Sequence, residues 1–217
     1  AMTISNSTNN GIVIGSGMYA GGLVGYMYKN NKINLNISYS NNNGNVTGSE
    51  SYAGGFAGFI EEDTNMNITI SNSINTGSII GSPNNAGGFV GYIYLETAMT
   101  MTIVSSINNG TVTAQSRVGG FVGYIQSGPD IVMILNSINN ATITGNEGYT
   151  GGFVGYINKY TNMTISNSIN NGNATGSDDY VGGFIGYISR NSNMTMTISN
   201  SINNGKVTGS DWYVGGF

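Results

Sequence analysis

The chain has 217 residues with a formal net charge of −4, and only 7% of its residues are charged. Its six Lys and Arg residues are too few for the basic surface that nucleic acids require, so we predict no nucleic-acid partner. The absence of Cys and His excludes disulfides, thiolate chemistry and the commonest general base and metal ligand. No apolar run reaches the roughly 18 residues of a membrane span.

A glycine-rich segment recurs through the chain, as in AGGLVGYM from Ala20 and VGGFIGYI from Val181. The first glycine of each GG pair follows the previous one by 31 to 33 residues, at Gly21, Gly54, Gly87, Gly119, Gly151, Gly182 and Gly215. A second motif, ISNSINNG from Ile165 and again from Ile198, keeps the same period. Two motifs with one period indicate a structural repeat. We therefore expect a single repeat domain over residues 1–217, as part of a longer array.

Within each copy, the first predicted element is a strand such as Met163–Ile169. Its alternation places Met163, Ile165, Asn167 and Ile169 on one face, with polar residues on the other, which is typical of a half-buried strand. A corner at residues 170–172 follows, because Asn and Gly tolerate the left-handed backbone of a sharp bend.

The second predicted strand is short, as at Lys206–Gly209, and a polar turn follows it. The third is the glycine-rich segment itself, for example Tyr180–Ile188, whose two faces are both apolar. We favour the Phe column of this strand, which includes Phe184, as the inward one. A polar loop of variable composition, such as Asn158–Asn162, closes the copy.

This pattern predicts an all-β fold, a parallel β-solenoid of about seven coils of 31–33 residues with three short strands per coil. Each strand would pair with its counterpart in the next coil, about 4.8 Å away. The alternative is a seven-bladed propeller, whose blades need four strands and usually about 40 residues or more. The repeat is short for such a blade, so the solenoid is favoured.

In a solenoid, equivalent residues stack into columns along the axis. One asparagine column falls on the face predicted to point inward, where stacked amides could bond one another as a structural ladder. Its members are Asn6, Asn72, Asn136, Asn167 and Asn200, and Tyr39 and Ser105 interrupt it. A polar binding site is the alternative interpretation of this column.

Two tyrosine columns follow from the same register. Tyr19, Tyr52, Tyr149, Tyr180 and Tyr213 form the first, and the second contains Tyr26, Tyr92, Tyr124, Tyr156 and Tyr187. Stacked rings stabilise a solenoid without any ligand, so a structural role is the simpler interpretation. The second column is also a possible ligand or partner surface, with a glycan as the first candidate.

Few residues suggest chemistry. Glu147, Asp178 and Asp211 occupy equivalent turns and form a weak Ca²⁺ candidate, but Pro83 and Ser116 break their column. Arg117 and Arg190 lie in different turns, and no strand carries paired acids of the kind that β-helical lyases use. We predict no enzyme activity, no cofactor and no bound metal.

Threonine pairs on a flat solenoid face can bind ice, which offers a further alternative. Thr111 with Thr113 and Thr142 with Thr144 fit this pattern, but the other copies do not repeat it. β-Branched threonine is common in any strand, so these pairs carry little weight.

The segment GGLVGYM at Gly21–Met27, followed by an Ile-x-Asn-Ser strand and a G-x-V-x-G strand, resembles the GLUG-motif repeat. The glycine–leucine–any–glycine core of that family is matched by Gly22, Leu23, Val24 and Gly25, although Phe usually replaces Leu in the other copies. The family occurs in surface proteins of bacteria, including some IgA-specific metalloproteases, and of protists. The resemblance implies an extracellular, β-rich stalk or spacer and transfers no catalytic residue.

From these observations we expect a non-enzymatic structural or adhesive segment of an extracellular or cell-surface protein. A carbohydrate-binding module is the alternative, and an ice-binding solenoid a weaker one. Partners would be a protein or glycan at a surface, or a second copy meeting the open ends of the solenoid, whose strand edges are unpaired.

Overall fold

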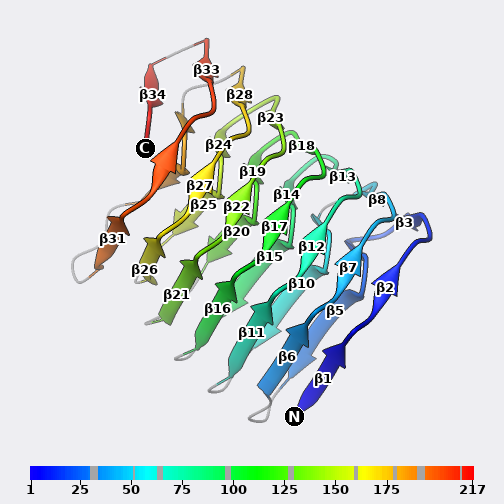
Figure 1. Ribbon diagram of the computed structural model, residues 1–217. Helices are drawn as coiled ribbons and strands as arrows, with labels where there is room; N and C mark the ends of the chain where they lie inside the picture. The colour runs from blue at the N-terminus through cyan, green and yellow to red at the C-terminus, as the bar shows by residue number, and fades with distance from the viewer. Residues whose placement is uncertain are drawn as a thin grey trace.

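The computed structural model describes residues 1–29, 34–50, 52–62, 66–95, 99–126, 130–158, 161–177, 180–189, 194–210 and 212–217. These residues form β-strands and no helix, and therefore no helix that could cross a membrane. The chain winds into coils that stack in one direction, with the N-terminus in the first coil and the C-terminus in the last (Figure 1). The predicted all-β parallel solenoid is confirmed.

The strands of successive coils form five parallel sheets, which we name A to E in chain order. Sheet A contains β1 (Met2–Ser5), β6 (Asn34–Ser38), β11 (Asn67–Ser71), β16 (Thr100–Val104), β21 (Asp130–Leu135), β26 (Thr161–Ser166) and β31 (Met196–Ser199). Sheet B contains β2 (Thr8–Asn9), β7 (Asn41–Asn42), β12 (Ile74–Asn75), β17 (Ile107–Asn108), β22 (Ile138–Asn139), β27 (Ile169–Asn170) and β32 (Ile202–Asn203). Sheet C contains β3 (Val13–Gly15), β8 (Val46–Gly48), β13 (Ile79–Gly81), β18 (Val112–Ala114), β23 (Ile143–Gly145), β28 (Ala174–Gly176) and β33 (Val207–Gly209).

The glycine-rich segment supplies the remaining two sheets. Sheet D contains β4 (Tyr19–Gly21), β9 (Tyr52–Gly54), β14 (Asn85–Gly87), β19 (Arg117–Gly119), β24 (Tyr149–Gly151), β29 (Tyr180–Gly182) and β34 (Tyr213–Gly215). Sheet E contains β5 (Val24–Lys29), β10 (Ala57–Glu62), β15 (Val90–Leu95), β20 (Val122–Gln126), β25 (Val154–Asn158) and β30 (Ile185–Ile188). The described residues therefore form six coils of five strands and a seventh with four.

Five strands per coil replace the three predicted from the sequence. The predicted first strand divides into β26 and β27, because Asn167 between them has a left-handed φ of 50°. The predicted third strand, Tyr180–Ile188, divides into β29 and β30 at a bend after Gly182. Neighbouring coils pair in register throughout, as in Ile165 with Ile198 and Tyr180 with Tyr213.

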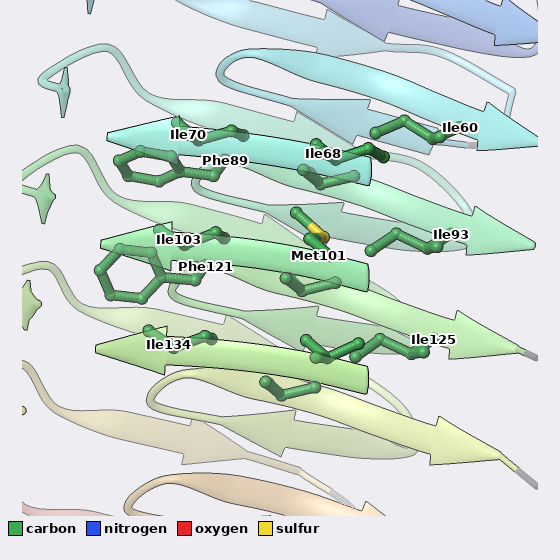
Figure 2. Close-up of a cluster of buried hydrophobic side chains, with 14 of the residues drawn as sticks. Ile60, Ile68, Ile70, Phe89, Ile93, Met101, Ile103, Phe121, Ile125 and Ile134 are labelled. Atoms are coloured by element: carbon green, nitrogen blue, oxygen red, sulfur yellow. The ribbon is translucent and has the colours of Figure 1, made fainter. Parts of the chain in front are cut away.

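The interior holds two apolar regions. The larger lies between sheets A and E, where isoleucines from both sheets and the Phe column form repeated layers (Figure 2). Phe56, Phe89, Phe121, Phe153 and Phe184 are all fully buried, which confirms the predicted inward Phe column. The smaller region lies between sheets C and D and consists of Val, Ile and Ala, for example Ile79 and Ala86.

Candidate functional site: amide ladders and the tyrosine layer

A buried asparagine ladder runs along sheet B, but it is not the predicted column. Its members are Asn9, Asn42, Asn75, Asn108, Asn139, Asn170 and Asn203. In each pair of neighbouring coils, Nδ2 of the earlier asparagine donates to Oδ1 of the next at 2.8–2.9 Å. From Asn42 to Asn170 these side chains are fully buried. The amides thus satisfy one another inside the solenoid, where an unpaired polar group would be costly.

A serine column accompanies the ladder, two residues earlier in each coil. Its members are Ser7, Ser40, Ser73, Ser106, Ser137, Ser168 and Ser201. Each backbone N–H donates to the serine Oγ of the next coil at 3.2–3.3 Å. Each Oγ in turn donates to a carbonyl two residues before it, as from Ser73 to Ser71 at 2.8 Å. Both columns keep one residue type in all seven coils.

The prediction of an inward ladder was therefore wrong for this column, whose members are Asn6, Asn72, Asn136, Asn167 and Asn200. All five side chains are exposed, and each residue has a φ of 48–50°. One left-handed residue shifts the alternation of the chain by one position, so that Ser168 and Asn170 point inward and Ile169 outward. The column is a row of bends, and asparagine recurs there because it tolerates the left-handed conformation better than other non-glycine residues.

A second amide ladder lies on the surface, one residue after the buried one. Asn43 donates to Asn10, Asn140 to Asn109, Asn171 to Asn140 and Asn204 to Asn171, each through Nδ2 to Oδ1 at 2.9 Å. In this ladder the donor belongs to the later coil, so its hydrogen bonds point opposite to those of the buried ladder. Thr76 replaces asparagine in one coil and donates its hydroxyl to Asn43 at 2.9 Å.

The tyrosines form a continuous layer on the outer side of sheets D and E, which we call the tyrosine layer. The structure brings together all five members of the predicted second column, with Phe59 completing it in the second coil. Ring centroids in this column lie 4.7 Å apart from Phe59 to Tyr92, 4.9 Å from Tyr92 to Tyr124 and 5.0 Å from Tyr124 to Tyr156. Tyrosines of the first column pack against them, as Tyr149 does at 4.8 Å from Tyr187.

Stacking leaves few ring faces open. Tyr92 and Tyr124 are 8% and 6% exposed, whereas Tyr26 in the first coil is 44% exposed. Burial raises the pKa of the Tyr92 and Tyr124 phenols above the ordinary value of 10.0. Both hydroxyls donate to Gln126 Oε1, at 2.7 and 2.9 Å. Inner rings of the layer are therefore covered by their neighbours, and exposed aromatic surface lies at its two ends, on Tyr26 in the first coil and on Tyr213, which is 59% exposed, in the last.

Asn85 and Arg117 replace tyrosine in two adjacent coils of the first column. The Arg117 guanidinium lies 4.4 Å from the centre of the Tyr124 ring and 5.4 Å from that of Tyr156, and its Nη1 donates to Asn85 Oδ1 at 3.3 Å. Cation–π contact thus holds the cation within the layer. Asn85 Nδ2 and Arg117 Nε are buried without a partner among the described residues.

The weak Ca²⁺ candidate gains no support. Glu147 is exposed in its turn, and Asp178 and Asp211 lie outside the described residues, as does Arg190. Across the ranges that the structure describes, no three acidic side chains gather in a way that could hold a metal ion.

Of the threonine pairs named above, Thr113 and Thr144 lie on the outer face of sheet C, and Thr111 and Thr142 directly precede its strands. Thr113, Thr144, Thr175 and Thr208 pair in register over four coils. The last three border a shallow groove of about 360 Å³ that is lined by Thr, Gly, Ser and Asn residues. Isoleucine occupies the equivalent position in the first and third coils, at Ile14 and Ile80.

No protein-family model and no curated protein sequence matches the chain significantly. Its fold is similar to that of a protein from Bacteroides ovatus, named in its crystal structure as a "putative immunoglobulin A1 protease", with a TM-score of 0.65 and 20% identity. The match covers 98% of this chain and 65% of that one, so this chain spans about two thirds of the length of its structural neighbour. At this identity, the likeness shows that the two proteins share the solenoid fold.

Proposed function

We propose that this chain is a rigid, non-enzymatic spacer segment of an extracellular or cell-surface protein. The observation that carries the proposal is that the recurring residues of the chain contact their counterparts in neighbouring coils. Ser, Asn, Gly, Phe and Tyr columns are engaged in contacts between neighbouring coils, as in the ladder bond from Asn75 to Asn108 and the stack of Tyr92 on Tyr124. A molecule built in this way resists bending and keeps its two ends at a fixed separation.

The extracellular or cell-surface location in this proposal rests on the resemblance to GLUG repeats described above. The name of the structural neighbour raises protease activity as a competing idea. A zinc protease of the HExxH type requires histidines, and this chain has none. Incubation with immunoglobulin A1 should leave the antibody intact, and specific cleavage would contradict the proposal.

The rigidity can be measured directly because the chain has no native cysteine. Thr3→Cys and Thr197→Cys place spin labels in one outward row of sheet A, six coil steps apart. Six steps of about 4.8 Å predict a narrow distance distribution near 29 Å between the labelled backbones. The pair Thr3→Cys and Asn36→Cys, one step apart, provides the control. A broad or much shorter distribution for the long pair would argue against a rigid spacer.

Carbohydrate binding remains the second candidate because of one feature of the first two coils. Tyr26 and Tyr28 are 44% and 47% exposed, and the Tyr26 hydroxyl donates to Glu61 Oε2 at 2.5 Å. Exposed rings beside a carboxylate can hold a sugar through stacking and hydrogen bonds. A glycan array probed with the chain and with Tyr26→Ala tests this: binding that the substitution abolishes would favour the module over the spacer.

A further inference from the structure

The repeated coils provide an internal reference for every outward position of sheet A. Three outward rows run along its outer face. The first contains Asn34, Asn67, Thr100, Ile131, Asn162 and Thr195; the second Thr3, Asn36, Thr69, Thr102, Met133, Thr164 and Thr197; the third Ser5, Ser38, Ser71, Val104, Leu135, Ser166 and Ser199. Small polar residues fill these rows except in the fifth coil, where all three positions are aliphatic, and at Val104 beside it.

The fold does not require these aliphatic side chains. β26 pairs in register with β21 and carries Asn162, Thr164 and Ser166 at the same three positions. Ile131 is 46% exposed, while Val132 and Ile134 on the inner face of the same strand are fully buried. A strand that is apolar on both faces is typical of a position between two packed layers. Within the described residues, only the inner layer is present.

The adjoining sheet B extends this apolar surface along the axis. Its outward residues, half-buried or exposed, include Ile74, Ile107, Ile138, Ile169 and Ile202. We call these isoleucines, together with Val104, Ile131, Met133 and Leu135, the outer aliphatic patch. It lies on the face formed by sheets A and B, which Figure 1 shows toward the viewer.

We infer that the outer aliphatic patch is a lateral interface for a second copy of this chain. No described outward residue of sheets A and B is charged, so two copies can meet here without repulsion although each carries a net charge of −4. A two-fold axis perpendicular to the rod would place the patch against itself, which closes the assembly as a dimer. The Ser, Thr and Asn rows on either side would form the polar rim of such an interface.

The size of the patch sets the strength of the association. A stable dimer usually buries about 800 Å² on each partner, and a patch whose members are mostly half-buried offers less apolar area. The interface should therefore be weak and depend on concentration. This inference rests on the fold and does not depend on the proposed function, because a monomeric rod could equally act as a spacer.

The test restores the pattern of the sixth coil to the fifth. Ile131→Asn, Met133→Thr and Leu135→Ser together copy Asn162, Thr164 and Ser166. Sedimentation equilibrium compares this coil-five variant with its parent, both carrying Ile14→Lys and Val214→Lys. These two lysines place charges on the end coils, where Ile14 and Val214 are 71% and 47% exposed, and suppress association through the ends. Thr3→Ala, on the same face but in the first coil and outside the patch, is the matched control.

The parent and the Thr3→Ala control should show a reversible monomer–dimer equilibrium. The coil-five variant should bind itself at least tenfold more weakly, with an unchanged circular dichroism spectrum. Met133→Cys should form a disulfide-linked dimer under mild oxidation, whereas Thr3→Cys, far from the patch, should not. A parent that stays monomeric at millimolar concentration would overturn the inference. So would a dimer that survives the coil-five substitutions.

Discussion

At the scale of single residues, one segment shows how the same amino acid serves three physical purposes. In SNSINNG, Asn167 supplies a left-handed bend, Asn170 a link in the buried ladder and Asn171 a link in the surface ladder. Of the three side chains only that of Asn170 is buried away from water. It therefore depends on other protein groups for all its hydrogen bonds, whereas the other two can also bond to water. Substitution at the three positions should therefore have unequal effects.

The buried ladder should be the most sensitive of these columns. Asn108→Ala removes the acceptor of one Asn75 hydrogen bond and the donor to Asn139 Oδ1, so that two buried amides each lose their ladder bond on one side. We expect a loss of about 2–3 kcal/mol in the free energy of unfolding, measured by denaturant titration. Asn109→Ala, the adjacent residue of the exposed ladder, should cost no more than about 0.5 kcal/mol. Equal losses would mean that the buried ladder contributes nothing beyond the surface one.

The row of bends offers a stabilising substitution. Tyr39 has a φ of 50°, where a side chain other than asparagine or glycine is strained, and its ring is 62% exposed. Tyr39→Asn should therefore raise the free energy of unfolding by about 0.5–1 kcal/mol, because little buried surface is lost and part of the strain is relieved. The reverse change, Asn72→Tyr, should lower it by a similar amount. The idea fails if Tyr39→Asn lowers the midpoint of thermal unfolding.

At the scale of elements, the glycine-rich segment brings sheet D and the ladder into backbone contact. A Cβ atom on Gly55 would lie 2.2 Å from the Gly88 carbonyl oxygen and 2.7 Å from Asn75 Oδ1. In the first six coils the second glycine of the GG pair thus packs directly against the buried ladder. No other residue fits this position without moving the backbone, which explains why the glycine recurs from one coil to the next wherever another coil follows.

Gly55→Ala should accordingly cost about 3 kcal/mol or more, and either unfold the chain or separate sheet D from the ladder. Gly17→Ala is the matched control, because nothing lies within 4 Å of a Cβ atom added there. Denaturant unfolding followed by circular dichroism compares the two. If both variants unfold at the same midpoint as the parent, the close packing at Gly55 is wrong.

At the scale of the whole molecule, the tyrosine layer makes the free energy of unfolding depend on pH in the alkaline range. Burial raises the pKa of the Tyr92 and Tyr124 phenols above 10.0, so the folded protein retains protons that the unfolded chain loses. The contribution of these two phenols to the free energy of unfolding is therefore fully present below pH 10.0, and it should fall as the pH rises above that value. Thermal unfolding at increasing pH measures the slope. Tyr92→Phe, which copies Phe59 of the same column, should reduce that slope, and an unchanged slope would exclude Tyr92 as a contributor.

The two ends of a chain of these 217 residues should also attract each other. Among the described residues, Asn203 Nδ2 in the last coil donates only to the Gly205 carbonyl, and Asn9 Oδ1 in the first accepts only from the Gly11 N–H. Trp212 and Ile12 are 83% and 72% exposed on these coils. We expect coaxial association at high concentration, seen by light scattering and suppressed by Ile14→Lys with Val214→Lys. A monomer at millimolar concentration without these lysines would contradict it.

Much of this architecture could be predicted from the sequence, because two different motifs recur with the same period and few folds have a repeat of this length. The in-register coils and the inward Phe column followed from it. The buried ladder was assigned to the wrong column, since alternation was extended through Asn167, whose left-handed backbone reverses it. One signal could have corrected this assignment: Ser168 and Asn170 have identical counterparts in all seven coils, whereas Tyr39 and Ser105 interrupt the other column. Exposure within the tyrosine layer could not be predicted, because it depends on how two columns of rings interleave.

The opposite directions of the two amide ladders have an electrical consequence. Each side-chain amide carries a dipole, and a row of them bonded head to tail adds up along the axis as the peptide groups of an α-helix do. In the buried row each donor belongs to the earlier coil, and in the surface row it belongs to the later one. The two rows therefore oppose each other, and each coil that carries both asparagines adds a pair of opposed dipoles. In a solenoid of this kind the dipole of the buried row is opposed along its length by the surface row, so the partial charge that accumulates at the ends is smaller than the buried ladder alone would give.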